Sequence, residues 1–178
     1  MKATGIVRRI DDLGRIVIPK EIRRTLKIRD GDPLEIYTDR EGEVIFKKYS
    51  PVGEMGAFAA QLCESVAKVA DCTVAVTDRD TVIAVSGPDK KLLSDKPLSE
   101  EVENIIESRK PYFDTDGGKG VKMTRAGEKT AFAAVPIVVM GDTTGCVLMA
   151  GDENALCTES EKKLASSVAG FLGRQIDS

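Results

Sequence analysis

The first fifty residues hold more large apolar side chains than a unit of that size can bury by itself. Two segments, Thr4 to Ile10 and Arg15 to Ile18, are rich in β-branched residues and would form strands that are apolar on both faces. One hairpin cannot cover both of those faces, and so small a fold buries too little surface alone. The sequence therefore predicts an intertwined dimer in which each chain covers the exposed faces of the other. The apolar side chains concerned are Ile6, Val7, Ile10, Leu13, Ile16, Val17, Ile18, Ile22, Leu26, Ile28, Leu34, Ile36, Val44, Ile45 and Phe46.

Turn and helix signals divide this segment further. The stretch from Asp11 to Gly14 predicts a turn between the two strands. Pro19 cannot lie within a central strand but suits the first position of a helix, and residues 30–33 end that helix. Leu34–Thr38 and Val44–Lys48 then predict a β-hairpin.

Charge is distributed unevenly along the chain. The net charge is -3, yet residues 1–50 hold 12 basic and 9 acidic groups, and the first 29 residues hold 9 basic and 3 acidic groups. A local field decides where a polyanion binds, so this distribution favours a nucleic-acid partner although the whole chain is acidic. The alternative is an ordinary solvated charged surface.

The amino-terminal segment also resembles a known family. "LGRIVIPKEIRRTL" followed by "GDPLEI" is similar to the AbrB family of swapped-hairpin DNA-binding domains, and the similarity extends over nearly all of residues 1–51. The resemblance implies a dimer of interleaved hairpins that contacts double-stranded DNA through arginines of both chains. Carried over by position, these arginines are Arg8, Arg15, Arg23 and Arg24, with Arg9 a weaker candidate.

The chemistry of arginine agrees with this role. The planar guanidinium group donates hydrogen bonds to phosphates and to guanine edges. Neighbouring helical residues point about 100° apart, so Arg23 and Arg24 diverge and could straddle the wall of a groove. Their short helix carries no Asn or Gln, which predicts weak base readout and selectivity through DNA shape and deformability. The competing interpretation is that the arginines form surface ion pairs with Asp11, Asp12 or Glu21.

The rest of the chain predicts an antiparallel sheet flanked by helices. We expect an α+β protein with an AbrB-type swapped-hairpin β-barrel dimer at 1–50, a linker at 51–54 and a second domain at 55–178. Within the second domain, residues 158–161 form a capping box that opens a terminal helix. The other expected elements are helices at 54–70 and 99–109 and strands at 72–77, 81–86, 121–124, 130–140 and 145–150.

"AVPIVVMGDTTGCVLMAG" resembles the closing hairpin of a GAF domain. The whole chain thus resembles AbrB-type regulators with a GAF-like domain, which implies activation and repression of transcription during spore development. The resemblance further implies a tetramer joined through GAF-side helices. It is also compatible with a small-molecule effector of unknown identity, which would bind within residues 86–125. The wide apolar arc of the helix at 54–70 fits either packing against another subunit or burial within one core.

Several classes of function are disfavoured by the residues that occur. The sequence has no histidine, which excludes Ser-His-Asp and Cys-His catalytic arrangements and histidine metal ligands. Cys63, Cys72, Cys146 and Cys157 lack the close spacing of a metal or redox motif and are expected to be buried apolar residues. "GGKGVK", at 117–122, lacks the pattern of a phosphate-binding loop and predicts a mobile loop. We therefore expect no enzyme activity, no catalytic residue, no metal and no cofactor.

The expected location is the cytoplasm, in association with the nucleoid. No apolar run approaches the ~20 residues of a membrane span, and the start of the chain has no apolar signal core. A second hypothesis is an antitoxin-type DNA-binding protein of a toxin–antitoxin module, because the same amino-terminal fold occurs there. Such proteins typically end in an extended tail, whereas this chain is expected to end in a folded domain.

Overall fold

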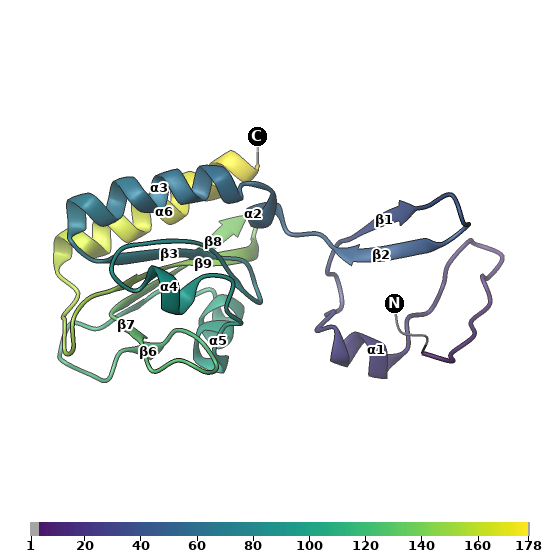
Figure 1. The fold of residues 1–178 in the computed structure, drawn as a ribbon, viewed down its shortest axis with the longest axis horizontal. Helices are drawn as coiled ribbons and strands as arrows, with labels where there is room; N and C mark the ends of the chain where they lie inside the picture. The colour runs from purple at the N-terminus through teal and green to yellow at the C-terminus, as the bar shows by residue number, and fades with distance from the viewer. Residues whose placement is uncertain (1–3, 178) are drawn as a thin grey trace. The chain divides into compact units, whose positions relative to one another are not determined.

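The computed structural model describes residues 4–177, which fall into two compact units, one ending at Tyr49 and one beginning at Ser50 (Figure 1). Residues 1–3 and 178, which belong to the two predicted domains, lie outside the described residues. Helices and antiparallel strands occur together in the chain, so the predicted α+β class is confirmed.

The first unit contains one short helix and one hairpin. Strands β1 (Leu34–Thr38) and β2 (Val44–Lys48) pair in antiparallel register, as predicted, with Thr38 opposite Val44. The Asp39 carboxylate closes the connecting turn, because one of its oxygens accepts the backbone N–H groups of Glu41 at 3.0 Å and Glu43 at 2.8 Å. The side chain thus satisfies backbone N–H groups that, within the turn, have no strand partner to accept them.

Helix α1 (Lys20–Thr25) follows Pro19, which occupies the N-cap position and not the first helical position. The helix ends where Lys27 adopts a left-handed backbone conformation, with φ of 53°. Lys48 of β2 then fixes this end to the hairpin, since its Nζ donates a 2.9 Å hydrogen bond to the carbonyl of Lys27. The carboxylate of Asp32 accepts the N–H of Arg29 at 2.8 Å and lies 3.8 Å from the same Nζ.

The two strands predicted at 4–10 and 15–18 are absent from the single chain. The turn between them is present, since the N–H of Gly14 donates to the carbonyl of Asp11 at 3.0 Å and the N–H of Asp11 donates to the carbonyl of Arg15 at 3.0 Å. The prediction fails for a physical reason: a strand needs a neighbouring strand to accept and donate its backbone hydrogen bonds, and the described part of this unit supplies none.

The second unit is built on a five-stranded antiparallel sheet with strand order β4-β3-β9-β8-β5. Helices α3 (Gly56–Ala70) and α6 (Glu159–Ile176) lie side by side on one face of the sheet, as Figure 1 shows. The opposite face carries α4 (Lys90–Leu93), α5 (Glu100–Ser108) and the small hairpin of β6 (Val121–Lys122) and β7 (Thr130–Ala131). The strands of the sheet are β3 (Thr73–Thr77), β4 (Val82–Ser86), β5 (Tyr112–Phe113), β8 (Ala133–Val139) and β9 (Asp142–Ala150).

Because both faces of the sheet are covered, its central strands are apolar on both sides. Along β9, Val147 and Met149 belong to the core under α3 and α6, whereas Cys146 and Leu148 belong to the core that includes Ile106 of α5. This alternation follows the two-residue period of a strand.

Several boundaries differ from those predicted. Residues 51–54, expected to be a linker, form the one-turn helix α2 (Pro51–Glu54), which Ser50 caps by accepting the N–H of Gly53 at 3.0 Å. Val52 of this helix is buried in the core of the second unit. The strand expected at 130–140 is divided at Phe132, because β7 pairs with β6 whereas β8 pairs with β9 and β5.

Candidate nucleic-acid interface

Arg8 and Arg15 lie on the two arms of the turn at Asp11–Gly14, and both are exposed. The Asp11 carboxylate organises this turn. Its Oδ1 accepts the N–H of Leu13 at 3.1 Å and of Arg15 at 2.7 Å, and its Oδ2 accepts Nε of Arg15 at 2.8 Å. The backbone hydrogen bond from Arg15, followed by the side-chain one, holds the pKa of Asp11 below its usual value, because both favour the ionised form.

Arg23 and Arg24 share helix α1 but differ in environment, as their divergence on the helix predicts. Nη1 of Arg23 forms an ion pair with Asp30, and its Nε is buried without a hydrogen-bond partner among the described residues. Arg24 is exposed, and no ion pair to it occurs in the described part of the chain. One guanidinium group is therefore partly fixed and its neighbour is open to solvent.

The competing interpretation of surface ion pairs applies in part to two of the four arginines. Arg15 pairs with Asp11 as that interpretation expected, but the partner of Arg23 is Asp30, which the sequence reasoning missed. Exposed ion pairs stabilise a protein by only about 0–1 kcal/mol, so a phosphate can replace the carboxylate of Asp30 at little cost, and the two Nη nitrogens of Arg15 lie outside its contact with Asp11. The ion pairs are thus compatible with binding of a polyanion.

Sequence reasoning gave Asp11 no role in the site except that of a possible ion-pair partner for an arginine. Its signal is present in the sequence, because an Asp that begins a turn commonly accepts backbone N–H groups two to four residues later. No comparable local pattern indicates Asp30, which lies seven residues after Arg23 and beyond the end of the helix.

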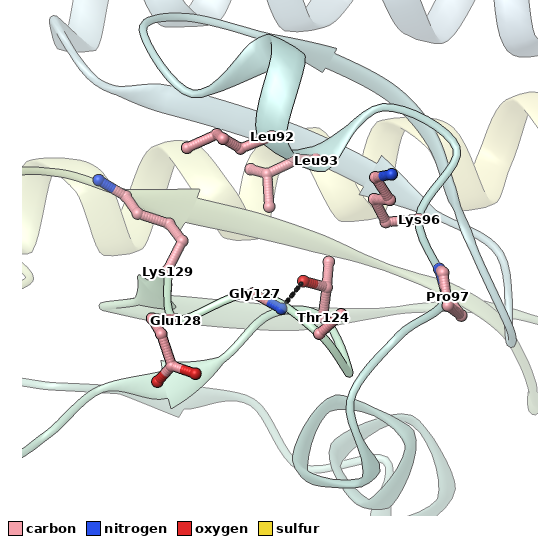
Figure 2. Close-up of a pocket in the computed structure, with 9 residues that line it drawn as sticks. Leu92, Leu93, Lys96, Pro97, Thr124, Gly127, Glu128 and Lys129 are labelled. Atoms are coloured by element: carbon pink, nitrogen blue, oxygen red, sulfur yellow. Dashed lines mark hydrogen bonds between the residues drawn. The ribbon is translucent and has the colours of Figure 1, made fainter.

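The second unit has a pocket of about 270 Å³ between α4 and the loop that follows β6 (Figure 2). Lys129 already has partners there, since its Nζ donates to the carbonyl of Gly151 at 2.6 Å and lies 2.7 Å from Asp89. Some of its lining residues fall within 86–125, the region expected for an effector, and the others lie just beyond it, as far as residue 129. Its lining residues are Leu92, Leu93, Lys96, Pro97, Thr124, Ala126, Gly127, Glu128 and Lys129.

The predicted loop at 117–122 reaches β6 at its carboxyl end and is fixed by the buried Asp114, whose oxygens accept the N–H groups of Gly118 at 2.8 Å and Gly120 at 3.0 Å.

All four cysteines are buried, as predicted. Burial raises the pKa of Cys63 to about 12 and those of Cys72 and Cys157 to about 11. Within residues 4–177, no helix combines the length and apolarity needed to cross a bilayer. The same residues contain no cluster of three or more His, Cys, Asp or Glu suited to a metal.

Comparison with known proteins agrees with a chain of two units. The family model described as "Stage V sporulation protein T C-terminal, transcription factor" matches residues 54–177. The chain is also 46% identical to stage V sporulation protein T of Bacillus subtilis (strain 168), over 99% of both chains. The chain belongs to the stage V sporulation protein T family. It is accordingly a transcriptional regulator.

Other similarities cover the two units separately. The chain is 36% identical to the transition state regulatory protein AbrB of B. subtilis over 62% of its own length and 98% of that protein. The family model described as "Antidote-toxin recognition MazE, bacterial antitoxin" matches residues 7–54. The GAF domain of a phosphoenolpyruvate-protein phosphotransferase from Coxiella burnetii aligns with a TM-score of 0.56 and 13% identity, over 68% of this chain and 82% of that one. This stage V sporulation protein T family member therefore combines an AbrB-type DNA-binding segment with a GAF fold.

Proposed function

We propose that this protein both activates and represses genes of spore development by binding duplex DNA through Arg8, Arg15, Arg23 and Arg24 of an intertwined amino-terminal dimer. One observation carries the proposal: in residues 4–49, Pro19 is the only buried residue, while three of these four arginines are exposed. The unit thus has an uncovered apolar surface and an available cationic one.

The dimer follows from that apolar surface. Val7 is 89% exposed, Val17 71% and Leu13 70%, values that a stable soluble unit does not keep over so many large side chains. Residues 4–10 and 15–18 also have strand composition without strand partners. A second copy of the unit would supply both the missing cover and the missing ladder hydrogen bonds.

A two-fold dimer doubles each arginine, which gives eight guanidinium groups for one duplex. Phosphate contacts would supply most of the affinity, since Arg23 can exchange its carboxylate partner for a phosphate and the two Nη nitrogens of Arg15 lie outside its contact with Asp11. Helix α1 has only six residues, too few to fill a major groove, so base readout is expected to be weak.

The second unit would assemble and regulate these dimers. Phe58 of α3 and Phe171 of α6 have ring centroids 5.8 Å apart, and both rings are partly exposed on the neighbouring helices. We propose that this surface joins two dimers into a tetramer, and that a small ligand in the pocket of Figure 2 modulates DNA binding. The functional domains would be 1–50 and 55–178, and the protein would act in the cytoplasm on the nucleoid.

The test is a salt titration of DNA affinity. Fragments identified by genome-wide mapping of bound DNA are labelled, and fluorescence anisotropy is followed as salt rises. Each phosphate neutralised contributes roughly -0.9 to the log–log slope. Arg23→Ala and Arg24→Ala should each cost about 1–3 kcal/mol of binding while the assembly keeps its mass.

Lys163→Ala is the matched control, because it removes one exposed positive charge from α6 in the second unit. Wild-type affinity in both arginine variants at about 150 mM salt rejects the assignment. Loss of binding in the control as well would point to total charge and not to these arginines.

The match of residues 7–54 to an antitoxin model keeps the toxin–antitoxin hypothesis as a second candidate. It predicts an extended tail that proteases remove quickly. Residues 50–177 instead form a folded unit with two covered sheet faces, which favours the regulator. Limited proteolysis separates the two hypotheses: a resistant core that begins near residue 50 supports the regulator.

A further inference from the structure

We propose that Asp11 is a positioning residue for DNA binding, which holds the Arg15 guanidinium group by its Nε so that both Nη nitrogens remain available to a phosphate. This inference rests on the proposed function and adds a residue to it. Residues with a negative charge are otherwise expected to weaken binding to a polyanion, so the assignment makes a prediction of opposite sign to simple electrostatics.

The contacts assign a separate task to each oxygen of Asp11. Oδ1 accepts the backbone N–H groups of Leu13 and Arg15 and so shapes the turn. Oδ2 accepts Nε of Arg15 at 2.8 Å. In the described part of the chain, neither Nη of Arg15 forms a hydrogen bond, and the side chain is 69% exposed. The guanidinium group is thus fixed along one edge and available along the other, which is the edge that binds a phosphate bidentately.

The turn that carries these contacts is itself closed by backbone hydrogen bonds. The N–H of Asp11 donates to the carbonyl of Arg15, and the N–H of Gly14 donates to the carbonyl of Asp11, each at 3.0 Å. Gly14 has φ of 76°, a conformation that glycine adopts without strain. All of these contacts lie within five residues of one chain, so they do not depend on which copy supplies the neighbouring strands.

The hydrogen bonds from Arg15 also keep the pKa of Asp11 below its usual value. The carboxylate is therefore ionised at neutral pH and can act as the acceptor. An arginine free in solution loses considerable rotamer entropy when it binds a phosphate. An arginine already oriented by a carboxylate loses less, and this difference offsets the repulsion between Asp11 and DNA.

Asp11→Asn isolates the task of Oδ2. The amide oxygen can still accept the N–H groups of Leu13 and Arg15, whereas the amide nitrogen that replaces Oδ2 cannot accept from Nε. Asp12→Asn is the matched control, since Asp12 is the exposed neighbour and its side chain has no hydrogen bond or ion pair in the described part of the chain. Both variants remove one negative charge from the same turn.

The experiment compares DNA affinity and salt slope for the full chain, with Asp11→Asn, Asp12→Asn, Arg15→Ala and the Asp11→Asn/Arg15→Ala double variant. We expect Asp11→Asn to bind DNA roughly three- to tenfold more weakly than the wild type and with a shallower slope. Asp12→Asn should bind as tightly as the wild type or more tightly. In the Arg15→Ala background, Asp11→Asn should no longer weaken binding, because the side chain it positions is gone.

Equal affinities of Asp11→Asn and Asp12→Asn overturn the inference, and so does weakening by Asp11→Asn that persists without Arg15. If either result is found and Arg15→Ala still weakens binding, the proposed function stands while the role of Asp11 fails. If no arginine variant changes binding, the proposed function fails as well. The Nε–H resonance of Arg15 gives an independent readout, because it should shift in Asp11→Asn and stay unchanged in Asp12→Asn if Asp11 orients the side chain.

Discussion

Val17 offers the sharpest test of the amino-terminal dimer. In the single chain its side chain is 71% exposed, so replacement by aspartate would change stability by no more than about 0.5 kcal/mol if the chain worked alone. In an intertwined dimer the same side chain lies among the apolar residues of two copies. Val17→Asp would then remove apolar burial and place a charge where no partner exists.

The magnitude follows from the size of the side chain. Full burial of a valine contributes about 1.5–3 kcal/mol, and a two-fold dimer contains two copies. The substitution should therefore cost about 3–6 kcal/mol per dimer before the charge is considered. Since each 1.4 kcal/mol is about tenfold in an equilibrium constant, the dissociation constant should rise by at least about 10²–10⁴.

Sedimentation equilibrium over a range of concentrations measures this change. Val17→Asp should halve the mass of the assembly at concentrations where the wild type is intact, and DNA binding should fall with it. Met140→Asp is the control, because Met140 is 87% exposed at the turn between β8 and β9 of the second unit. If Val17→Asp retains the mass and the DNA affinity of both wild type and control, the dimer argument is refuted.

Three further outcomes are expected. Gly145→Ala should destabilise the second unit by about 3 kcal/mol in urea unfolding, because the added Cβ would lie 1.9 Å from the carbonyl oxygen of Thr77, whereas Gly56→Ala, with its nearest contact at 3.6 Å, should be tolerated. Thr158→Ala should cost about 0.5–2 kcal/mol in the same assay through loss of the capping box, and Thr158→Ser should keep most of it. Burial raises the pKa of Cys63 to about 12, so its thiolate is scarce below that pH and grows only as pH rises towards it. Native protein at pH 8 should consequently react slowly with a thiol reagent and unfolded protein quickly, and rapid reaction of the native thiols would contradict the assigned burial.

Local signals predicted the elements whose stabilising contacts lie close in sequence. The capping box at Thr158 is present with both of its hydrogen bonds, because the residues that form it are three apart. The hairpin of β1 and β2 has the predicted bounds, since alternation and a glycine-containing turn specify it locally. Ser99 likewise caps α5 by accepting the N–H of Val102 at 3.2 Å.

Other features depend on contacts between distant residues and could not be predicted in the same way. Nothing near Phe132 indicates that one apolar run leaves the small hairpin of β6 and β7 and enters the main sheet. Helix α2 is stabilised by burial of Val52 beneath α3 and α6, which the sequence of a supposed linker does not reveal. For the candidate site, the different environments of Arg23 and Arg24 could be predicted from their divergence on the helix, but the pairing of Arg23 with Asp30 depends on the left-handed turn at Lys27.

The segments at 4–10 and 15–18 differ from these cases, because there the local signal and the single chain disagree. β-branched residues, apolar on both faces, specify strands that must be covered on both sides. The single chain leaves most of those side chains exposed, and among the described residues the backbone–backbone hydrogen bonds of these segments lie at the turn around Asp11. A chain whose local preferences favour one structure, and which lacks the partners for it, can obtain them from a second molecule, and the strand-forming apolar residues of the segment itself suit such a partner. We propose that an identical copy is this partner, which would bring Arg8 and Arg15 of two chains into one symmetric assembly.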